Sequence, residues 1–167
     1  MFISAIAALG TFYDDAKDIF DKDSLEKQVV RLVAKVPTIA AMCYRFSQGL
    51  PFVSPNNALS YGENFLNMMF RIGDDYTVNP VLARAMDILF ILHADHEQNC
   101  STATVRLVGS SQANLFASVS AGVSALFGPL HGGANEAVLE MLKEIRESGD
   151  GVKKYIDRVK NKEDGVK

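Results

Sequence analysis

His131 has the sequence surroundings of a residue that could take part in catalysis. It follows a Gly128-Pro129 break, precedes Gly132 and Gly133, and stands just before a segment with a helical pattern. Glycines let a backbone or a ligand approach closely, and the first turn of a helix carries partial positive charge and unpaired amide donors. This field disfavours a charged imidazolium, so we expect a neutral His131 near neutral pH.

A neutral imidazole in this position can donate a hydrogen bond to a carbonyl oxygen that becomes negative during enolisation, as in triosephosphate isomerase. The alternative interpretation is that His131 only caps the helix and that the two glycines only shape the turn. The residue types alone leave both interpretations open.

His93 and His96 form the second group of candidates. Because they are three residues apart, they would share one face of a helix. A zinc site would need a third ligand, from His131, Asp95 or Glu97, and the i, i+4 histidine pair of the HExxH motif is absent. Alternatively, one histidine is a core residue and the other is exposed, or His96 ends its helix at a pocket and binds a substrate carboxylate through its ring N–H. We assign no metal site from these patterns.

The elements that must position these residues are helical almost throughout, so we predict an all-α fold with antiparallel helix packing and no significant β-sheet. Residues 2–13 are predicted as a buried helix, and Asp23-Ser24 as the N-cap of the next one. Pro37 is expected to kink or break that helix near Lys35, because proline removes a backbone donor and clashes with the preceding turn.

Later boundaries have clearer signals. Residues 50–58 form a loop, Ser60 and Glu63 have the spacing of a capping box, and Asn79-Pro80 is typical of a helix start. Further helices are predicted by the remaining patterns, at 101–110, at 114–127, at 133–147 and, as a short segment, at 152–159.

Length and composition narrow the class of protein. The chain has 167 residues, 17 Lys+Arg against 20 Asp+Glu, and a net charge of -3. This fits one domain without a nucleic-acid partner, since phosphate binding normally needs a basic stripe. Because no apolar run approaches the ~18 residues of a membrane span, we expect no membrane partner. Cys43 and Cys100 lie far apart, which favours free thiols and a cytoplasmic location.

Several blocks of sequence resemble those of citrate synthases. Residues 128–137, GPLHGGANEA, are similar to the signature around a catalytic histidine, and residues 92–99, LHADHEQN, to the oxaloacetate-binding segment. Residues 37–42 and 59–69 resemble stretches of bacterial members. The blocks have the order and spacing of the family and extend over essentially the whole chain.

The resemblance implies the helical large domain of an acyltransferase that condenses acetyl-CoA with oxaloacetate and water to citrate and CoA. This is the first step of the tricarboxylic acid cycle, and it needs no further cofactor. His131 matches the histidine that hydrogen-bonds the thioester oxygen. His96 matches the one that holds oxaloacetate, Asn99 a residue lining that pocket, and Ser101 a serine that hydrogen-bonds and orients the catalytic histidine. Methylcitrate synthases, which use propionyl-CoA, share these motifs, and a non-catalytic helical assembly or metal-binding module is the alternative from another class.

The resemblance also implies elements that lie later in the family's sequence: a second catalytic histidine in a GHRVY-type motif, an aspartate base, carboxylate-binding arginines and a small domain. We therefore expect residues 1–167 to be part of the large domain of a longer enzyme and to be inactive alone. Arg31 and Lys35 resemble two basic residues of the NADH-responsive site in hexameric bacterial members, whereas the cysteine expected near Gly73-Asp74 is absent. Self-association as a homodimer or hexamer is expected from the family.

Overall fold

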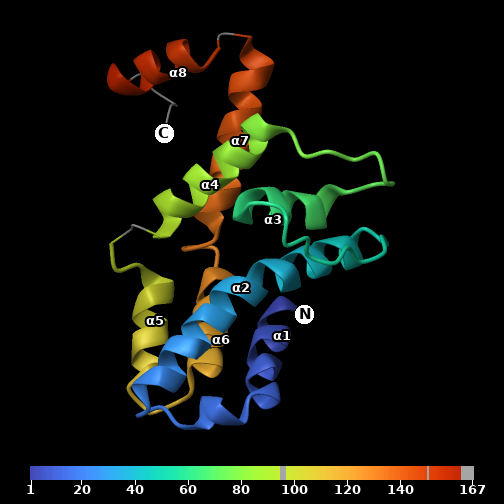
Figure 1. Ribbon diagram of the computed structural model, residues 1–167. Helices are drawn as coiled ribbons and strands as arrows, with labels where there is room; N and C mark the ends of the chain where they lie inside the picture. The colour runs from blue at the N-terminus through green and yellow to red at the C-terminus, as the bar shows by residue number, and fades with distance from the viewer. Residues whose placement is uncertain (95–96, 150, 163–167) are drawn as a thin grey trace. The chain divides into compact units, whose positions relative to one another are not determined.

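The computed structural model describes residues 1–94, 97–149 and 151–162. Over these ranges the secondary structure is helical and contains no strand, which confirms the predicted all-α class. The elements are shown in Figure 1 and run, in chain order, α1 (Phe2–Leu9), η1 (Gly10–Phe12), η2 (Asp14–Lys17), α2 (Lys22–Ser47), α3 (Tyr61–Phe70), α4 (Pro80–Ala94), α5 (Cys100–Gly109), α6 (Leu115–Leu126), α7 (Gly133–Ser148) and α8 (Gly151–Lys160). None of the helices in these ranges has both the length and the apolar content needed to cross a membrane.

The chain divides into two compact units, Met1–Ala125 and Leu126–Lys167. The core of the first unit lies where α1, α2 and α6 meet. Ile6 and Phe116 are fully buried there, and Leu32 of α2 packs against them. The ring of Tyr13 stacks on Phe116 with 5.8 Å between ring centroids. Residues far apart in the sequence thus share one apolar cluster.

Hydrogen bonds between helices complete the packing around α6. The hydroxyl of Ser120 donates to the carbonyl oxygen of Ile3 in α1 at 3.0 Å. The hydroxyl of Ser101 in α5 donates to the carbonyl oxygen of Gly122 at 2.9 Å. Serine hydroxyls of α5 and α6 therefore donate to the backbones of neighbouring helices.

Two predicted features of the first helices are wrong. The first helix ends at Leu9 and continues as the 3₁₀ helix η1, so it does not extend as one helix to residue 13. The N-cap of α2 is Asp21, whose side chain accepts from the N–H of Asp23 at 3.1 Å, and not Asp23-Ser24. Ser24 is buried instead, and its hydroxyl donates to the carbonyl oxygen of Asp15 at 2.6 Å.

Of the kink or break predicted near Lys35, the break is wrong, because α2 runs without interruption from Lys22 to Ser47 with Pro37 inside it. A proline at position 37 leaves the carbonyl oxygen of Val33 without the N–H donor that a helix normally supplies. The hydroxyl of Tyr61, at the start of α3, donates to this carbonyl oxygen at 2.7 Å. A side chain distant in sequence thus replaces the missing bond, and the helix continues.

Helix α2 is joined to the segment around α3 by one buried cation. Arg45 is only 3% exposed, and its guanidinium donates to the carbonyl oxygen of Pro51 and to those of Met69 and Arg71, the latter two at 3.1 and 3.0 Å. Three main-chain carbonyl groups therefore satisfy this guanidinium in the interior, as a buried charged donor requires.

The predicted starts of α3 and α4 are confirmed. Ser60 and Glu63 form the capping box of α3. The side chain of Asn79 accepts from the N–H of Val81, and α4 begins at Pro80.

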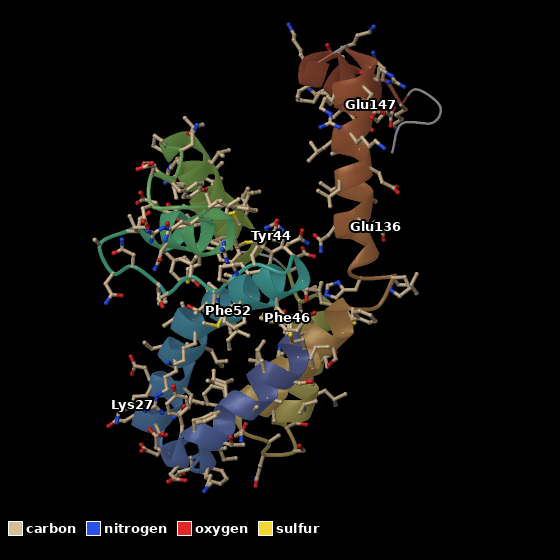
Figure 2. All side chains as sticks on the ribbon, turned by 90° about the vertical axis from the view of Figure 1, so that its right-hand side faces the viewer. Lys27, Tyr44, Phe46, Phe52, Glu136 and Glu147 are labelled. Carbon is tan, nitrogen blue, oxygen red and sulfur yellow. The ribbon has the colours of Figure 1, made fainter. Side chains whose placement is uncertain are left out.

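In the second unit, α7 and α8 pack against each other. Gly149 ends α7 in the left-handed conformation, with φ +69°. Tyr155 of α8 is buried, and the guanidinium of Arg158 lies 3.9 Å from the carboxylate of Glu144. In Figure 2, Glu136 and Glu147 mark the first and last turns of α7. The predicted amphipathic helix at 133–147 is therefore present, one residue longer than expected.

Candidate active site

His131 lies in a short hydrogen-bonded turn directly before α7. The carbonyl oxygen of Gly128 accepts the N–H groups of both His131 and Gly132, at 3.0 and 2.8 Å. The carbonyl oxygen of His131 in turn accepts the N–H of Ala134 at 3.3 Å, inside the first turn of the helix. Main-chain bonds on both sides therefore fix the position of His131 relative to the start of α7.

Gly132 and Gly133 have different roles in this turn. A Cβ atom on Gly132 would overlap the carbonyl oxygen of Leu126, so only glycine fits the close approach of these two backbones. A Cβ atom on Gly133 would have no atom of the described residues within 4 Å. Steric crowding in this structure therefore explains the first glycine but not the second.

The electrostatic setting of the turn is that of a helix N-terminus. Gly132 is the N-cap residue, and it provides no side-chain hydrogen bond to the helix. The partial positive charge of the first turn acts on groups close to the helix start, and Glu136 in that turn partly offsets it. The arrangement suits a hydrogen-bond donor that faces a developing negative charge.

Asn99 and Ser101, the two other predicted site residues in the described ranges, lie together at the start of α5. Asn99 is the N-cap residue, and its side-chain oxygen accepts from the N–H of Thr102 at 3.0 Å. The hydroxyl of Ser101 donates to Gly122 in α6. These residues belong to the first unit, and His131 belongs to the second. The predicted bond between Ser101 and the catalytic histidine therefore stays a prediction.

The histidine pair is described only in part. The Nδ1 atom of His93, near the end of α4, lies 2.7 Å from the carbonyl oxygen of Leu89 and donates to it. His96 and the neighbouring Asp95 lie outside the described residues, so their predicted roles are not tested. Within the ranges that are described, no three His, Cys, Asp or Glu side chains form a group able to hold a metal ion.

Arg31 and Lys35, the two residues with a predicted allosteric role, line the same cavity of about 630 Å³ between α2 and α3. Arg31 donates to Asp15 at 2.6 Å and to the side chain of Gln28 at 3.0 Å, and its guanidinium lies 4.1 Å from the ring centroid of Tyr13. The hydrogen bond from Arg31 is the main reason why the pKa of Asp15 is lowered. The charge of Arg31 is thus already paired within the protein.

Polar residues that the sequence patterns did not single out complete this cavity. Asn57, Asn64 and Tyr61 line it together with the two cations. The side-chain oxygen of Asn64 accepts from the N–H of Asn56 at 2.9 Å, which attaches the loop before α3 to the helix. Tyr61 and Asn64 are three residues apart, and helical spacing is the one signal that could have placed them on a common face.

Comparisons with known proteins agree on one family. The family model described as "Citrate synthase, C-terminal domain" matches residues 1–166. Citrate synthase 1 of Mycobacterium tuberculosis is 57% identical over 165 residues, which are 98% of this chain and 38% of that protein. The citrate synthase of Corynebacterium glutamicum is 51% identical over 166 residues, again 98% of this chain and 38% of the relative. The chain thus spans well under half the length of these curated relatives.

Solved structures give the same answer for the fold. The crystal structure of citrate synthase from Pyrobaculum aerophilum superposes with a TM-score of 0.77 at 39% identity, covering 86% of this chain and 37% of that one. The crystal structure of the Thermotoga maritima MSB8 enzyme gives a TM-score of 0.65 at 30% identity, covering 99% of this chain and 42% of that one. From the matched residues and the shared helical fold, the chain belongs to the citrate synthase family.

Proposed function

We propose that the polypeptide containing this chain is a citrate synthase, an acyltransferase that condenses acetyl-CoA with oxaloacetate and water to citrate and CoA. Residues 1–167 would be part of its large helical domain. The enzyme would catalyse the first step of the tricarboxylic acid cycle in the cytoplasm, as a homodimer or hexamer. The observation that carries this proposal is the hydrogen-bonded turn that holds His131 next to the start of α7.

In the proposed reaction, a base outside this chain removes a proton from the methyl group of acetyl-CoA. The electron pair of the broken C–H bond moves toward the thioester, and negative charge develops on its oxygen. His131 donates a hydrogen bond to this oxygen, and the first turn of α7 adds its partial positive charge. The methyl carbon then bonds to the ketone carbon of oxaloacetate, the π electrons of the ketone move to its oxygen, and this oxygen takes up a proton to become a hydroxyl. Water then cleaves the thioester to release CoA.

The start of α5 would contribute to the oxaloacetate site. The cap bond of Asn99 uses its side-chain oxygen, so its NH₂ group is the part that would face a substrate carboxylate or carbonyl. His96 would hold oxaloacetate through a ring N–H. Ser101 would orient the catalytic histidine from a backbone position set by its own bond to Gly122.

A chimera tests the proposal directly. The 165 matched residues of this chain replace the corresponding segment of Mycobacterium tuberculosis citrate synthase 1, and CoA release from acetyl-CoA and oxaloacetate is measured. The chimera should turn over, and His131→Ala should lower kcat by about 100-fold to 1000-fold, the range for loss of an oxyanion donor. Lys143→Ala, on the exposed surface of α7, is the matched control. Near-normal turnover of a folded His131→Ala chimera would exclude the catalytic role.

The same assay separates the alternatives. A higher kcat/KM for propionyl-CoA than for acetyl-CoA would identify the polypeptide as a methylcitrate synthase. A folded, correctly assembled chimera without any turnover would favour a non-catalytic helical module. We expect the 167-residue chain alone to release no CoA, because it spans only 38% of the length of the matched relative and contains no GHRVY-type motif.

The proposal also gives Arg31 and Lys35 a regulatory role, because both line one cavity and NADH carries two phosphates. NADH should inhibit the chimera, and Lys35→Ala should weaken that inhibition without changing kcat. The absence of inhibition by NADH would remove this role and leave the catalytic proposal unaffected.

A further inference from the structure

The longest helix in the described part of the chain, α2, consists of two halves that are attached to different parts of the first unit. In the N-terminal half, Ser24 donates to the carbonyl oxygen of Asp15, and Arg31 pairs with the carboxylate of the same residue. Leu32 joins the apolar core with α1 and α6. This half is therefore held by the segment that precedes α2.

The C-terminal half is attached to α3, the next helix along the chain. Ala41 is buried, and the guanidinium of Arg45 donates to the carbonyl oxygens of Met69 and Arg71 at the end of α3. Figure 2 labels Lys27 on the first half of α2 and Tyr44 on the second, at opposite ends of the helix. Each half thus has its own anchor, and Pro37 lies between them.

Pro37 makes this junction weak within the helix itself. The carbonyl oxygen of Val33 receives no bond from position 37, because proline has no N–H, and the proline ring crowds the same turn. Sharp bends in helices occur at such positions. Without a donor from outside α2, the carbonyl oxygen of Val33, which lies near the junction of the two anchored halves, would have no hydrogen bond.

Tyr61 connects the two halves across this junction. It is the first residue of α3, which Arg45 fastens to the C-terminal half, and its hydroxyl donates at 2.7 Å to Val33 in the N-terminal half. Its ring packs edge-on against Phe90 with 5.6 Å between centroids, which fixes the direction of the hydroxyl. The hydroxyl is a donor at neutral pH, because the ordinary pKa of tyrosine is 10 and partial burial raises the pKa of Tyr61 further.

We propose that Pro37 is a joint in α2 and that the Tyr61 hydroxyl is the latch that keeps this joint closed. Tyr61 is 47% exposed, so water can compete for its partner and the latch can open. Arg31 and Lys35 line the cavity from the N-terminal side of the joint, and Thr38 from the C-terminal side. Opening of the latch would change the distance between the cavity-lining residues on the two sides of Pro37. The shape of the cavity would therefore depend on how α2 packs on α3.

A double-mutant cycle tests the latch against a role in packing alone. Hydrogen exchange of residues 34–41 is measured by mass spectrometry in the full chain and in its Tyr61→Phe, Pro37→Ala and doubly substituted variants. Tyr61→Phe should speed exchange of this segment about threefold to tenfold, the effect of one lost hydrogen bond. In the Pro37→Ala background the N–H of residue 37 supplies the bond, so Tyr61→Phe should change exchange less than about twofold.

Two further measurements keep the outcome interpretable. Tyr44→Phe removes a hydroxyl from α2 without touching Val33 and should leave exchange of residues 34–41 unchanged. Exchange of α6 serves as the internal reference, because a general loss of fold would speed it equally. The unsubstituted sequence and the three variants of the cycle, placed in the chimera, repeat the cycle in an assembled protein. An equal effect of Tyr61→Phe in both backgrounds, or no effect in either, would overturn the latch.

Discussion

The main-chain N–H of Gly62 donates to Oδ1 of Asp87 at 3.0 Å, so a carboxylate from α4 closes the first turn of α3. A Cβ atom on Gly62 would overlap this oxygen and lie 3.1 Å from the carbonyl oxygen of Ala83. The two helices therefore meet through a backbone-to-carboxylate contact that leaves no room for a side chain. The negative charge also faces the positive end of α3, which is the favourable orientation.

Removal of this carboxylate should destabilise the protein. Asp87→Ala loses both the hydrogen bond and the favourable charge, and should lower the free energy of unfolding by about 1–2 kcal/mol. The measurement is urea unfolding of the full chain. Asp74→Ala is the control, because the Asp74 carboxylate is fully exposed in its pair with Arg71, and this substitution should change the free energy of unfolding little. An equal loss of unfolding free energy in Asp87→Ala and Asp74→Ala would show that Asp87 acts only as a surface charge.

The turn before α7 should tolerate a methyl group at one glycine and not at the other. Gly132→Ala forces the backbone away from Leu126 and displaces His131, so in the chimera kcat should fall about 10-fold to 100-fold. Gly133→Ala adds the same methyl group where no described atom lies within 4 Å, and should leave the melting temperature unchanged. A normal kcat for Gly132→Ala would mean that the position of His131 does not depend on this contact.

Close packing of α5 on α6 should depend on Gly122. A Cβ atom there would lie 2.5 Å from Cγ2 of Val105 and 3.3 Å from the carbonyl oxygen of Ser101. Because valine has little rotamer freedom, Gly122→Ala should cost about 1–3 kcal/mol in unfolding free energy. The added substitution Val105→Ala should recover part of this loss.

Gly109→Ala in the same pair of helices is the matched control for Gly122. Its added methyl group would be 3.8 Å from the Ser118 hydroxyl, an ordinary contact distance. It should not destabilise the protein, because alanine also favours a helix more than glycine does. A loss equal to that of Gly122→Ala would show that the cost does not arise from the contact with Val105.

The ion pair between Arg31 and Asp15 should make part of the stability depend on pH. The pKa of Asp15 is lowered from its ordinary value of 3.8, chiefly by the hydrogen bond from Arg31. A carboxyl group with a lowered folded-state pKa stabilises the protein above its unfolded-state pKa and loses this effect as pH falls through the folded-state value. Asp15→Asn should therefore be destabilising near neutral pH, and the difference from the unsubstituted chain should shrink below about pH 3.8.

The measurement for this pair is the urea midpoint at a series of pH values. Asp14→Asn removes a neighbouring carboxylate that pairs with the exposed Lys17 on the surface, and should have little effect. A difference for Asp15→Asn that stayed constant down to strongly acidic pH would contradict the assignment of the ion pair.

Local signals predicted most of the helices, because their capping residues act within four positions. Ser60 with Glu63, and Asn79 with Pro80, have effects confined to one helical turn, and the structure confirms them. The predicted alternative of a break at Pro37 is wrong because the missing hydrogen bond is replaced by Tyr61, a residue in another helix. The N-cap of α2 is Asp21 and not Asp23 for a similar reason. The hydroxyl of Ser24 donates to the carbonyl oxygen of Asp15, outside the helix, and this contact accompanies a helix that begins before Ser24.

The candidate site was predictable in composition but not in geometry. The histidine and the glycines at positions 128–133 predicted the turn, and the order of the matching sequence blocks predicted the family. That Gly132 meets a backbone oxygen while Gly133 faces open space depends on the path of residues 126–132, which no residue type encodes. The bond of Ser101 to Gly122 likewise depends on how two helices pack.

The buried guanidinium of Arg45 has a consequence for how this chain can be altered. It holds the carbonyl oxygen of Pro51 at one end and that of Arg71 at the other, so the intervening loop and α3 form a ring closed by a single side chain. The entropy lost on closing a ring rises only with the logarithm of its length. Extra residues inserted beside the exposed Ser54, before the bond that attaches Asn56 to Asn64, would lengthen a ring whose ends remain fastened, which makes this part of the loop a suitable insertion point for a peptide tag or reporter.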